Sequence, residues 1–322
     1  MIFVWIGLGI AALVLLASYI SFRMAYFVPE KEKIRPEYEM PPGKIYKPYY
    51  PLMRKWMEEV RAMPCQELST TTFDGLTLYG KYYEYAPGAP IELMFHGYRG
   101  TAERDLCGGV QRAFSLERSV LIVDQRGAGK SGGNVITFGV KEHKDCLCWV
   151  DFMVKHFGED VKIVLCGISM GASTVLLAAG QELPRQVIGV LADCGFSSAR
   201  AIIQKVIAQM KLPPKALYPF VRLGAMLFGG FDPNKADMVK ALQNCKVPVI
   251  FFHGDADNYV PCHMSQENFD ACAAVKRLVI TPGAGHGMCY LVDQQSYLQP
   301  LREFAPNWGL GTDSNKKQEV SH

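Results

Sequence analysis

A Gly-x-Ser-x-Gly sequence at residues 167–171 is the feature of this 322-residue chain that most directly predicts chemistry. It follows an apolar run at 161–165 and precedes an alanine-rich stretch at 172–179 that favours a helix. The two glycines allow a sharp strand-to-helix turn that leaves the Ser169 hydroxyl exposed. The helix N-terminus behind it stabilises a developing negative charge. We therefore interpret Ser169 as a nucleophile rather than as part of a simple connecting turn.

A serine hydroxyl is a weak nucleophile at neutral pH, so it needs a base and a carboxylate that orients the base. Both residue types follow Ser169 along the chain. His286 lies between two glycines, just after an apolar run at 278–280. Asp257 lies in a loop that follows the apolar run at 247–252. Because catalytic groups gather at the carboxyl ends of parallel strands, we expect these side chains to meet.

The orienting carboxylate has two alternatives to Asp257. Asp255 lies two residues earlier in the same loop and could instead shape the turn. Asp193 follows another apolar run, so it could reach His286 from a neighbouring strand end. We favour Asp257, and the predicted catalytic residues are Ser169, Asp257 and His286.

Short apolar runs alternate with longer segments that can form helices, which predicts an α/β fold with helices on both faces of a sheet. Segments at 68–73 and 76–84, joined by Asp-Gly, predict a β-hairpin. The predicted buried strands are residues 91–95, 120–123, 161–165, 187–191, 247–252 and 278–280. Crossover helices are expected at 143–157 and 170–181. Residues 197–244 show no strand pattern and predict a helical cap.

The first 22 residues contain no charged side chain and form an apolar run long enough to span a bilayer. A cleaved signal peptide is the alternative, but such a peptide begins with basic residues and has a shorter apolar region. Basic residues follow this run, at Arg23, Lys31, Lys33 and Arg35. The positive-inside rule then predicts a retained single-pass anchor with the catalytic domain in the cytoplasm, although two glutamates lie among these cations.

Composition divides the chain further. Six prolines and mixed charges in residues 23–51 predict an extended linker. A single α/β domain is expected at 52–310. It begins with a short helix at 52–62 and contains the cap at about 197–244. Residues 311–322 are expected to form a polar tail.

Overall composition excludes several classes of protein. Hydrophobic residues make up 49% and charged residues 20% of the chain, which is compatible with a buried core and excludes a disordered polymer. The net charge of +3, without a long basic block, gives no support for nucleic-acid binding. Ten cysteines without a Cys-x-x-Cys pair, several of them in apolar runs, predict reduced core residues.

Two motifs that suggest cofactors lack the context they need. The Gly-x-Gly-x-x-Gly sequence at 127–132 continues into Gly133 and Asn134 instead of opening a helix, so a dinucleotide site is not expected. The Gly-Lys-Ser sequence at 129–131 lacks the leading glycine of a phosphate-binding loop. Cys146 and Cys148 are too close for a usual zinc pair. We therefore predict no cofactor and no metal.

Four motifs together resemble those of the α/β-hydrolase superfamily. They are His-Gly-Tyr-Arg-Gly at 96–100, Asp-Gln-Arg-Gly-Ala-Gly-Lys-Ser at 124–131, the serine motif at 167–171, and the loops that carry Asp257 and His286. The resemblance extends over about residues 68–304 and is similar to the branch that includes bacterial esterases and Bem46-like proteins, several of which carry an N-terminal anchor.

This resemblance implies an α/β-hydrolase fold, with a mostly parallel central sheet flanked by helices and a helical cap insertion. It also implies that the backbone N–H groups of Tyr98 and Met170 form an oxyanion hole, and that His96 is a structural partner beneath that loop.

The expected activity is hydrolysis of a carboxylic ester with a hydrophobic or lipid-like acyl group, through an acyl-enzyme on Ser169. A serine peptidase or an acyltransferase with the same three residues is the first alternative. A non-catalytic, membrane-tethered binding protein is the second. The expected partners are a small-molecule ester or lipid substrate and the membrane, and the sequence does not indicate an oligomeric state.

Overall fold

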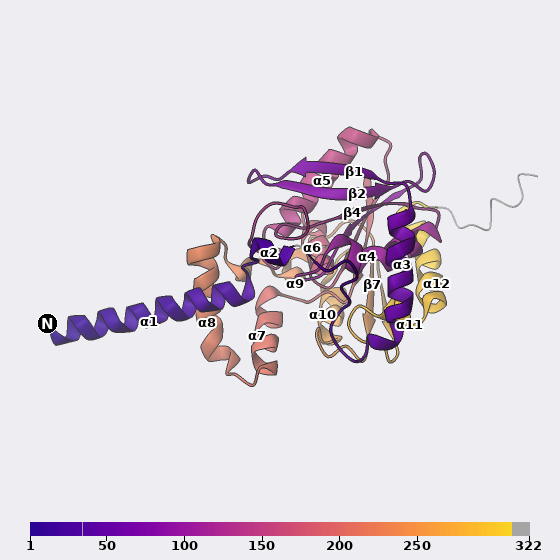
Figure 1. Cartoon of the computed structure of the whole chain (residues 1–322). Helices are drawn as coiled ribbons and strands as arrows, with labels where there is room; N and C mark the ends of the chain where they lie inside the picture. Colours follow the sequence, from indigo (N-terminus) through magenta and orange to yellow (C-terminus); the bar gives the residue numbers. More distant parts are fainter. Residues whose placement is uncertain (34, 311–322) are drawn as a thin grey trace, which may run out of the picture.

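The computed structural model describes residues 1–33 and 35–310, and it is built around one eight-stranded sheet (Figure 1). The strands are β1 (Gln66–Thr71), β2 (Thr77–Tyr83), β3 (Ile91–Phe95), β4 (Ser119–Val123), β5 (Ile163–Ile168), β6 (Val187–Asp193), β7 (Val249–Gly254) and β8 (Lys276–Thr281). Their spatial order is β1-β2-β4-β3-β5-β6-β7-β8. The first two strands form the predicted hairpin, β2 pairs antiparallel with β4, and all other pairs are parallel.

Helices cover both faces of this sheet. The helices are α1 (Ile2–Ala25), α2 (Glu30–Lys33), α3 (Tyr50–Ala62), α4 (Ala102–Phe114), α5 (Glu142–Phe157), α6 (Met170–Ala179), α7 (Ala199–Gln209), α8 (Pro214–Gly224), α9 (Met238–Leu242), α10 (His263–Ala271), α11 (Cys289–Val292) and α12 (Gln294–Phe304). Short helical turns are η1 (Lys47–Tyr49), η2 (Ala225–Gly229), η3 (Pro233–Lys235) and η4 (Ala305–Trp308). One core packs α5 and α6 against the sheet, and the other packs α3, α4 and α12 against its opposite face. The fold is therefore the predicted one.

The segment between β6 and β7 contains helices α7 to α9 and no strand among its described residues, in agreement with the helical cap expected there. Helix α1 extends away from the sheet, and α8 lies across α1 (Figure 1). Within the described residues, α1 is the one helix long and apolar enough to cross a membrane. The tail expected at 311–322 lies outside the described residues.

Residues 23–51 do not run as the extended linker that their prolines predict. Tyr26 and Val28 are fully buried. The Val28 N–H donates to the Asn134 carbonyl over 2.8 Å, and the Ile136 N–H donates to the Tyr26 carbonyl over the same distance. Burial of Tyr26 and Val28, just before the first proline of this segment, outweighs the preference of the prolines for an isolated extended chain. This segment is part of the folded body.

Every side chain of β3 is buried, including the charged Glu92. Its carboxylate accepts hydrogen bonds from the guanidinium groups of Arg112 and Arg118, the latter over 2.8 Å. Burial alone would raise the pKa of Glu92, but the two guanidinium charges hold that pKa below its ordinary value. Glu92 is therefore the carboxylate partner that two buried guanidinium groups share.

We expect Glu92→Ala to lower the free energy of unfolding by about 3–5 kcal/mol, because it leaves two buried guanidinium groups without their carboxylate. Urea unfolding monitored by circular dichroism measures this change. The control Glu84→Ala removes an exposed carboxylate and is expected to change stability by less than about 0.5 kcal/mol. Equal unfolding midpoints for the two variants would contradict the assigned role of Glu92.

Candidate active site

Ser169 occupies a strained turn between β5 and α6. Its φ of +56° lies in the left-handed region that non-glycine residues rarely adopt. A Cβ atom at Gly167 would lie 2.2 Å from the backbone of Gly171, and one at Gly171 would lie 2.0 Å from the Phe95 carbonyl oxygen. Gly167 is therefore required for the turn to fold back on the start of α6, and Gly171 for α6 to pack against β3. This is the physical reason for the Gly-x-Ser-x-Gly spacing.

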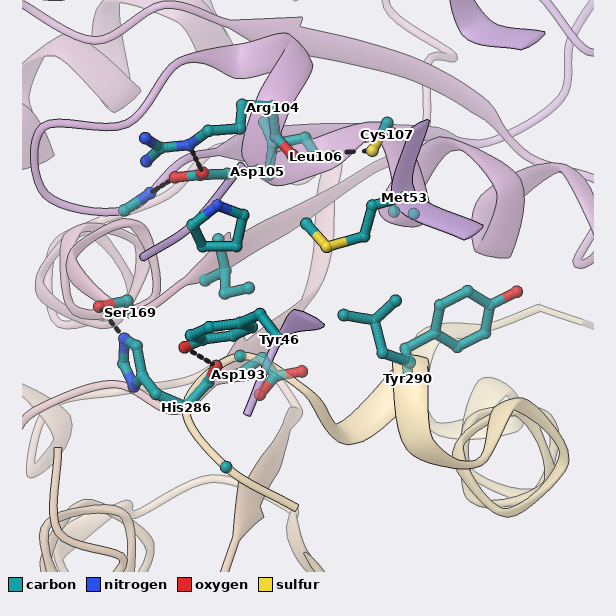
Figure 2. Close-up of a pocket in the computed structure, with 18 of the residues that line it drawn as sticks. Tyr46, Met53, Arg104, Asp105, Leu106, Cys107, Ser169, Asp193, His286 and Tyr290 are labelled. Atoms are coloured by element: carbon teal, nitrogen blue, oxygen red, sulfur yellow. Dashed lines mark hydrogen bonds and ion pairs between the residues drawn. The ribbon is translucent and has the colours of Figure 1, made fainter. Parts of the chain in front are cut away.

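The structure brings together the three side chains predicted from the sequence. His286 Nε2 lies 2.9 Å from Ser169 Oγ, and His286 Nδ1 lies 2.7 Å from Asp257 Oδ2 (Figure 2 shows the first of these contacts). Since the Asp257 carboxylate accepts the Nδ1 proton, Nε2 carries a lone pair that accepts the serine hydroxyl proton. The three groups form one continuous hydrogen-bonded chain.

Asp257 is held in its ionised form by several donors. Its Oδ1 accepts the backbone N–H groups of Tyr259 and Val260, each over 2.8 Å. Burial opposes ionisation, but hydrogen bonds with His253 and His286 outweigh it and keep the pKa of Asp257 below its ordinary value. The negative charge at this position stabilises the imidazolium that would form when His286 takes the serine proton.

The two alternative carboxylates are engaged elsewhere. Asp255 is exposed and accepts the Gly283 N–H over 2.6 Å, as expected for a residue that shapes a turn. Asp193 accepts the Tyr297 hydroxyl over 3.0 Å, and burial raises its pKa. Neither has a hydrogen bond to His286, so Asp257 is the carboxylate that the fold pairs with the histidine.

The loop at 97–100 lies against the nucleophile. A Cβ atom at Gly97 would lie 3.5 Å from Ser169 Cβ, and the Gly97 N–H donates to Asp105 Oδ2 over 3.0 Å. Met170 is the first residue of α6, so its N–H has no acceptor within the helix. The N–H groups of Tyr98 and Met170 have no acceptor among the described residues. Both N–H groups that were expected to form an oxyanion hole are thus free to bind an oxyanion.

His96 is a structural residue, as expected. Its Nε2 accepts the Gln125 N–H over 3.0 Å, and its Nδ1 lies 2.8 Å from the Gly97 carbonyl oxygen. Both ring nitrogens are therefore occupied in the neutral form. The neighbouring glycine-rich sequence at 127–132 closes a turn through a bond from the Gly127 N–H to the Gly132 carbonyl over 3.0 Å. It is not followed directly by a helix, because α5 begins only at Glu142.

A cavity of about 500 Å³ opens beside Ser169 and His286, on the side of the sheet that α3 and α4 cover (Figure 2). Tyr98 contributes to its wall together with both of these residues. Its apolar lining includes Ile45, Met53, Trp56, Leu106, Ile168 and Leu291. Two of these side chains come from α3, and Ile45 comes from the segment that the sequence predicted to be a linker.

Cys194 lies beside the His286–Asp257 pair, and one ligand atom from each of the three residues falls within 4.8 Å of the others. Burial raises the pKa of the Cys194 thiol well above its ordinary value, so the thiol stays protonated. The histidine and the carboxylate already bond to each other. This donor set therefore does not fit a metal ion in the arrangement that the fold gives it.

Sequence reasoning missed Tyr46. Its hydroxyl donates to the backbone carbonyl of His286 over 2.7 Å, although 240 positions separate the two residues. Nothing in the local sequence around Tyr46 distinguishes it from the other tyrosines nearby. It is a positioning residue that ties the catalytic histidine loop to residues 23–51.

We expect Tyr46→Phe to lower kcat severalfold and to reduce stability by about 1 kcal/mol, because one buried hydrogen bond to the His286 loop is lost. The KM for a small ester should stay nearly constant, because the ring remains in place. Steady-state kinetics and thermal unfolding measure both effects. Tyr50→Phe is the control, since its hydroxyl donates to Pro41 and not to the catalytic loop; kinetics that match Tyr46→Phe would contradict the positioning role.

Comparisons with known proteins find a family match over part of the chain and relatives of low identity. A family model described as serine aminopeptidase, S33, matches residues 92–223. The YqkD protein of Bacillus subtilis is 28% identical over 196 residues, which cover 61% of this chain and 64% of that protein. The chain thus matches slightly less than two thirds of that relative. Protein bem46 of Schizosaccharomyces pombe is 24% identical over 233 residues, 70% of each chain.

An esterase from Pyrococcus furiosus has a similar structure, with a TM-score of 0.65 and 21% sequence identity. The alignment covers 84% of this chain and 97% of the esterase. At that identity the likeness concerns the fold. Together, the sheet order and this shared structure establish that the chain has the α/β-hydrolase fold.

Proposed function

We propose that this protein is a serine hydrolase that cleaves carboxylic esters with an apolar acyl group. The observation that carries the proposal is the hydrogen-bonded chain of Ser169, His286 and Asp257, which ends at an apolar cavity. The esterase fold of a solved structure supports the same reaction class.

In the proposed reaction, Ser169 Oγ attacks the ester carbonyl carbon while His286 Nε2 takes its proton. The carbonyl oxygen becomes an oxyanion that accepts the N–H groups of Tyr98 and Met170. His286 then gives the proton to the departing alcohol, which leaves an acyl group on Ser169. A water molecule, deprotonated by His286, releases the acid and restores the serine.

The cavity favours an ester over a peptide with a free amino terminus. The two acidic side chains that line it are Asp105 and Asp193. Asp105 accepts hydrogen bonds from Arg104 and the Gly97 N–H, and Asp193 accepts one from Tyr297. Neither is a solvated carboxylate ready to bind an ammonium group. Arg104 and Arg112 also line the cavity, but most of the remaining wall is apolar and suits an acyl chain.

A panel of p-nitrophenyl esters graded by acyl chain length, tested beside aminoacyl p-nitroanilides, examines this proposal. We expect ester hydrolysis with a chain-length optimum and at most weak anilide hydrolysis. Faster anilide hydrolysis would indicate a peptidase. Transfer of the acyl group to an added alcohol, in place of water, would indicate an acyltransferase. No turnover of any substrate by folded protein would support the binding-protein alternative.

We also propose that α1 anchors the protein in a membrane, with the hydrolase domain in the cytoplasm. The helix is 24 residues long, and its last turn contains Arg23. Cys65 is exposed on the domain and is a suitable reporter. An impermeant maleimide should label Cys65 only after the cells are lysed, with Cys65→Ser as the control. Labelling of Cys65 in intact cells would show that the domain lies on the opposite side of the membrane.

A further inference from the structure

The cap has an unusual distribution of charge. Residues 199–231, which include α7, α8 and η2, contain five basic residues and no aspartate or glutamate. Lys211 and Lys215 are exposed beside the turn between α7 and α8. Exposed apolar side chains accompany these cations, at Met210, Leu212, Met226, Leu227 and Phe228. A surface that combines cations with exposed apolar groups is suited to an anionic membrane interface.

This surface is held directly against the end of α1. Gly224 packs so closely on α1 that a Cβ atom there would lie 2.2 Å from the Ser18 carbonyl oxygen. The ring of Phe228 lies 5.2 Å from that of Tyr19 and 5.9 Å from that of Phe22. Ser18 and Phe22 are buried by these contacts. The cap and the last turns of α1 therefore form one packed unit.

The apolar surface of α1 does not end where the cap begins. Ile20 and Met24 remain about half exposed on the side of the helix that the cap leaves open. The first charged residue, Arg23, follows the contact with the cap and places its guanidinium over the ring of Phe27. Because the hydrocarbon boundary lies where an apolar transmembrane surface ends, that boundary falls at the level of α8 and η2.

A second set of hydrogen bonds fixes this level relative to the loop at 97–100. The Tyr98 hydroxyl donates to the carbonyl of Ala25, the last residue of α1, over 2.9 Å. The Arg99 guanidinium donates to the carbonyls of Met24 and Phe27. The end of α1 is thus joined to the loop that borders the cavity, so a membrane-anchored α1 would hold the cavity close to the membrane surface.

We propose that the outer face of the cap, formed by α8 and η2, inserts into the interfacial region of an anionic phospholipid leaflet. Leu227 and Phe228 are its apolar contacts, and the exposed Lys211 and Lys215 bind the lipid phosphates. The inference rests on the proposed anchoring by α1 and adds a second, peripheral lipid contact. With the cap inserted in this way, the substrates that reach the cavity are esters located at the lipid–water interface.

Site-specific photo-crosslinking of the full chain in vesicles of phosphatidylcholine and phosphatidylglycerol tests this contact. The photo-reactive residue p-benzoylphenylalanine replaces Phe228 in one sample, Leu13 of α1 in a second, and Phe73 in a third. Phe73 is a matched control, because its exposed fraction of 49% resembles the 42% of Phe228 and it lies outside the cap. We expect lipid adducts at 228 and 13, on the order of tenfold above those at 73.

The outcomes separate the two proposals. Adducts at 13 with only the control level at 228 would overturn the cap insertion and leave the anchor standing. Control levels at both positions would overturn both. A protein–protein adduct at 228 would identify a second copy of the chain as the occupant and would also overturn the lipid contact.

A kinetic measurement adds an independent readout. The double substitution Leu227→Asn and Phe228→Asn should slow hydrolysis of an ester embedded in anionic vesicles on the order of tenfold, with unchanged turnover of a soluble short-chain ester. Val275→Asn, at an exposed apolar position outside the cap, should change neither rate. Equal rates for wild type and double variant on vesicles would contradict the proposal, and a parallel loss on both substrates would contradict it as well, since it would indicate damage to the fold.

Discussion

Replacement of Ser169 with alanine is expected to lower kcat for ester hydrolysis by about 10,000-fold or more, because it removes the hydroxyl that lies 2.9 Å from His286 Nε2. Steady-state hydrolysis of a p-nitrophenyl ester measures the loss. Residual activity above that of buffer is expected from the oxyanion donors and the cavity alone.

The fold should survive this substitution. Alanine removes one oxygen and keeps the Cβ atom, so the melting temperature is expected to change by no more than a few degrees. Ser69→Ala, at an exposed position of β1, is the matched control and should retain full activity. Retained turnover by Ser169→Ala would show that another residue is the nucleophile.

Replacement of Asp257 with asparagine is expected to lower kcat on the order of 10,000-fold with little change in KM. The amide keeps the size of the side chain but removes the charge that stabilises a protonated His286. It can also present an N–H group to Nδ1, which would favour the wrong tautomer. Because the pKa of Asp257 is lowered in the fold, its charge persists well into the acid range, and activity at acidic pH should not be limited by this carboxylate.

Asp255→Asn is the control for this measurement. Asp255 lies in the same loop but accepts the Gly283 N–H in the turn, so its replacement should change kcat only a few-fold. Asp193→Asn tests the remaining alternative, because that carboxylate bonds to Tyr297 and not to the histidine. A large loss in either of these variants, with activity retained by Asp257→Asn, would reassign the orienting acid.

Much of the sheet could be predicted because its central strands are buried on both faces. The run at 91–95, apolar except for Glu92, shows this directly, and β3 has the same bounds. The strand predicted at 161–165 is instead Ile163–Ile168, because the pairing with β6 continues to the residue before Ser169. Strand ends next to the site are set by tertiary pairing, which local composition does not encode.

The three residues of the candidate site were predictable because each follows an apolar run and carries its own turn glycines. Tyr46 and the cavity wall were not, since their contacts join segments far apart in the chain. The prolines in residues 23–51 indicated correctly that a long helix is absent there. They could not show that Tyr26 and Val28 would be buried, because burial depends on partners such as Phe138 and Phe231.

The packing of α1 on the cap could not be predicted from the sequence for the same reason. Composition identifies an apolar helix, but the close approach at Gly224 depends on a residue about two hundred positions away. A glycine in the middle of an apolar segment has many explanations in a sequence. Only the assembled structure shows that it admits the backbone of another helix.

Labelling with a fluorophosphonate is the most direct test of the central claim, that Ser169 is an activated nucleophile. The reagent phosphonylates a serine only when a neighbouring base has prepared its hydroxyl. The full-length protein should gain one adduct by intact mass, and peptide mapping should locate it on Ser169, with no adduct in Ser169→Ala and a strongly reduced rate in Asp257→Asn. A folded wild-type protein that gains no adduct, or gains it on a different serine, would contradict the assignment.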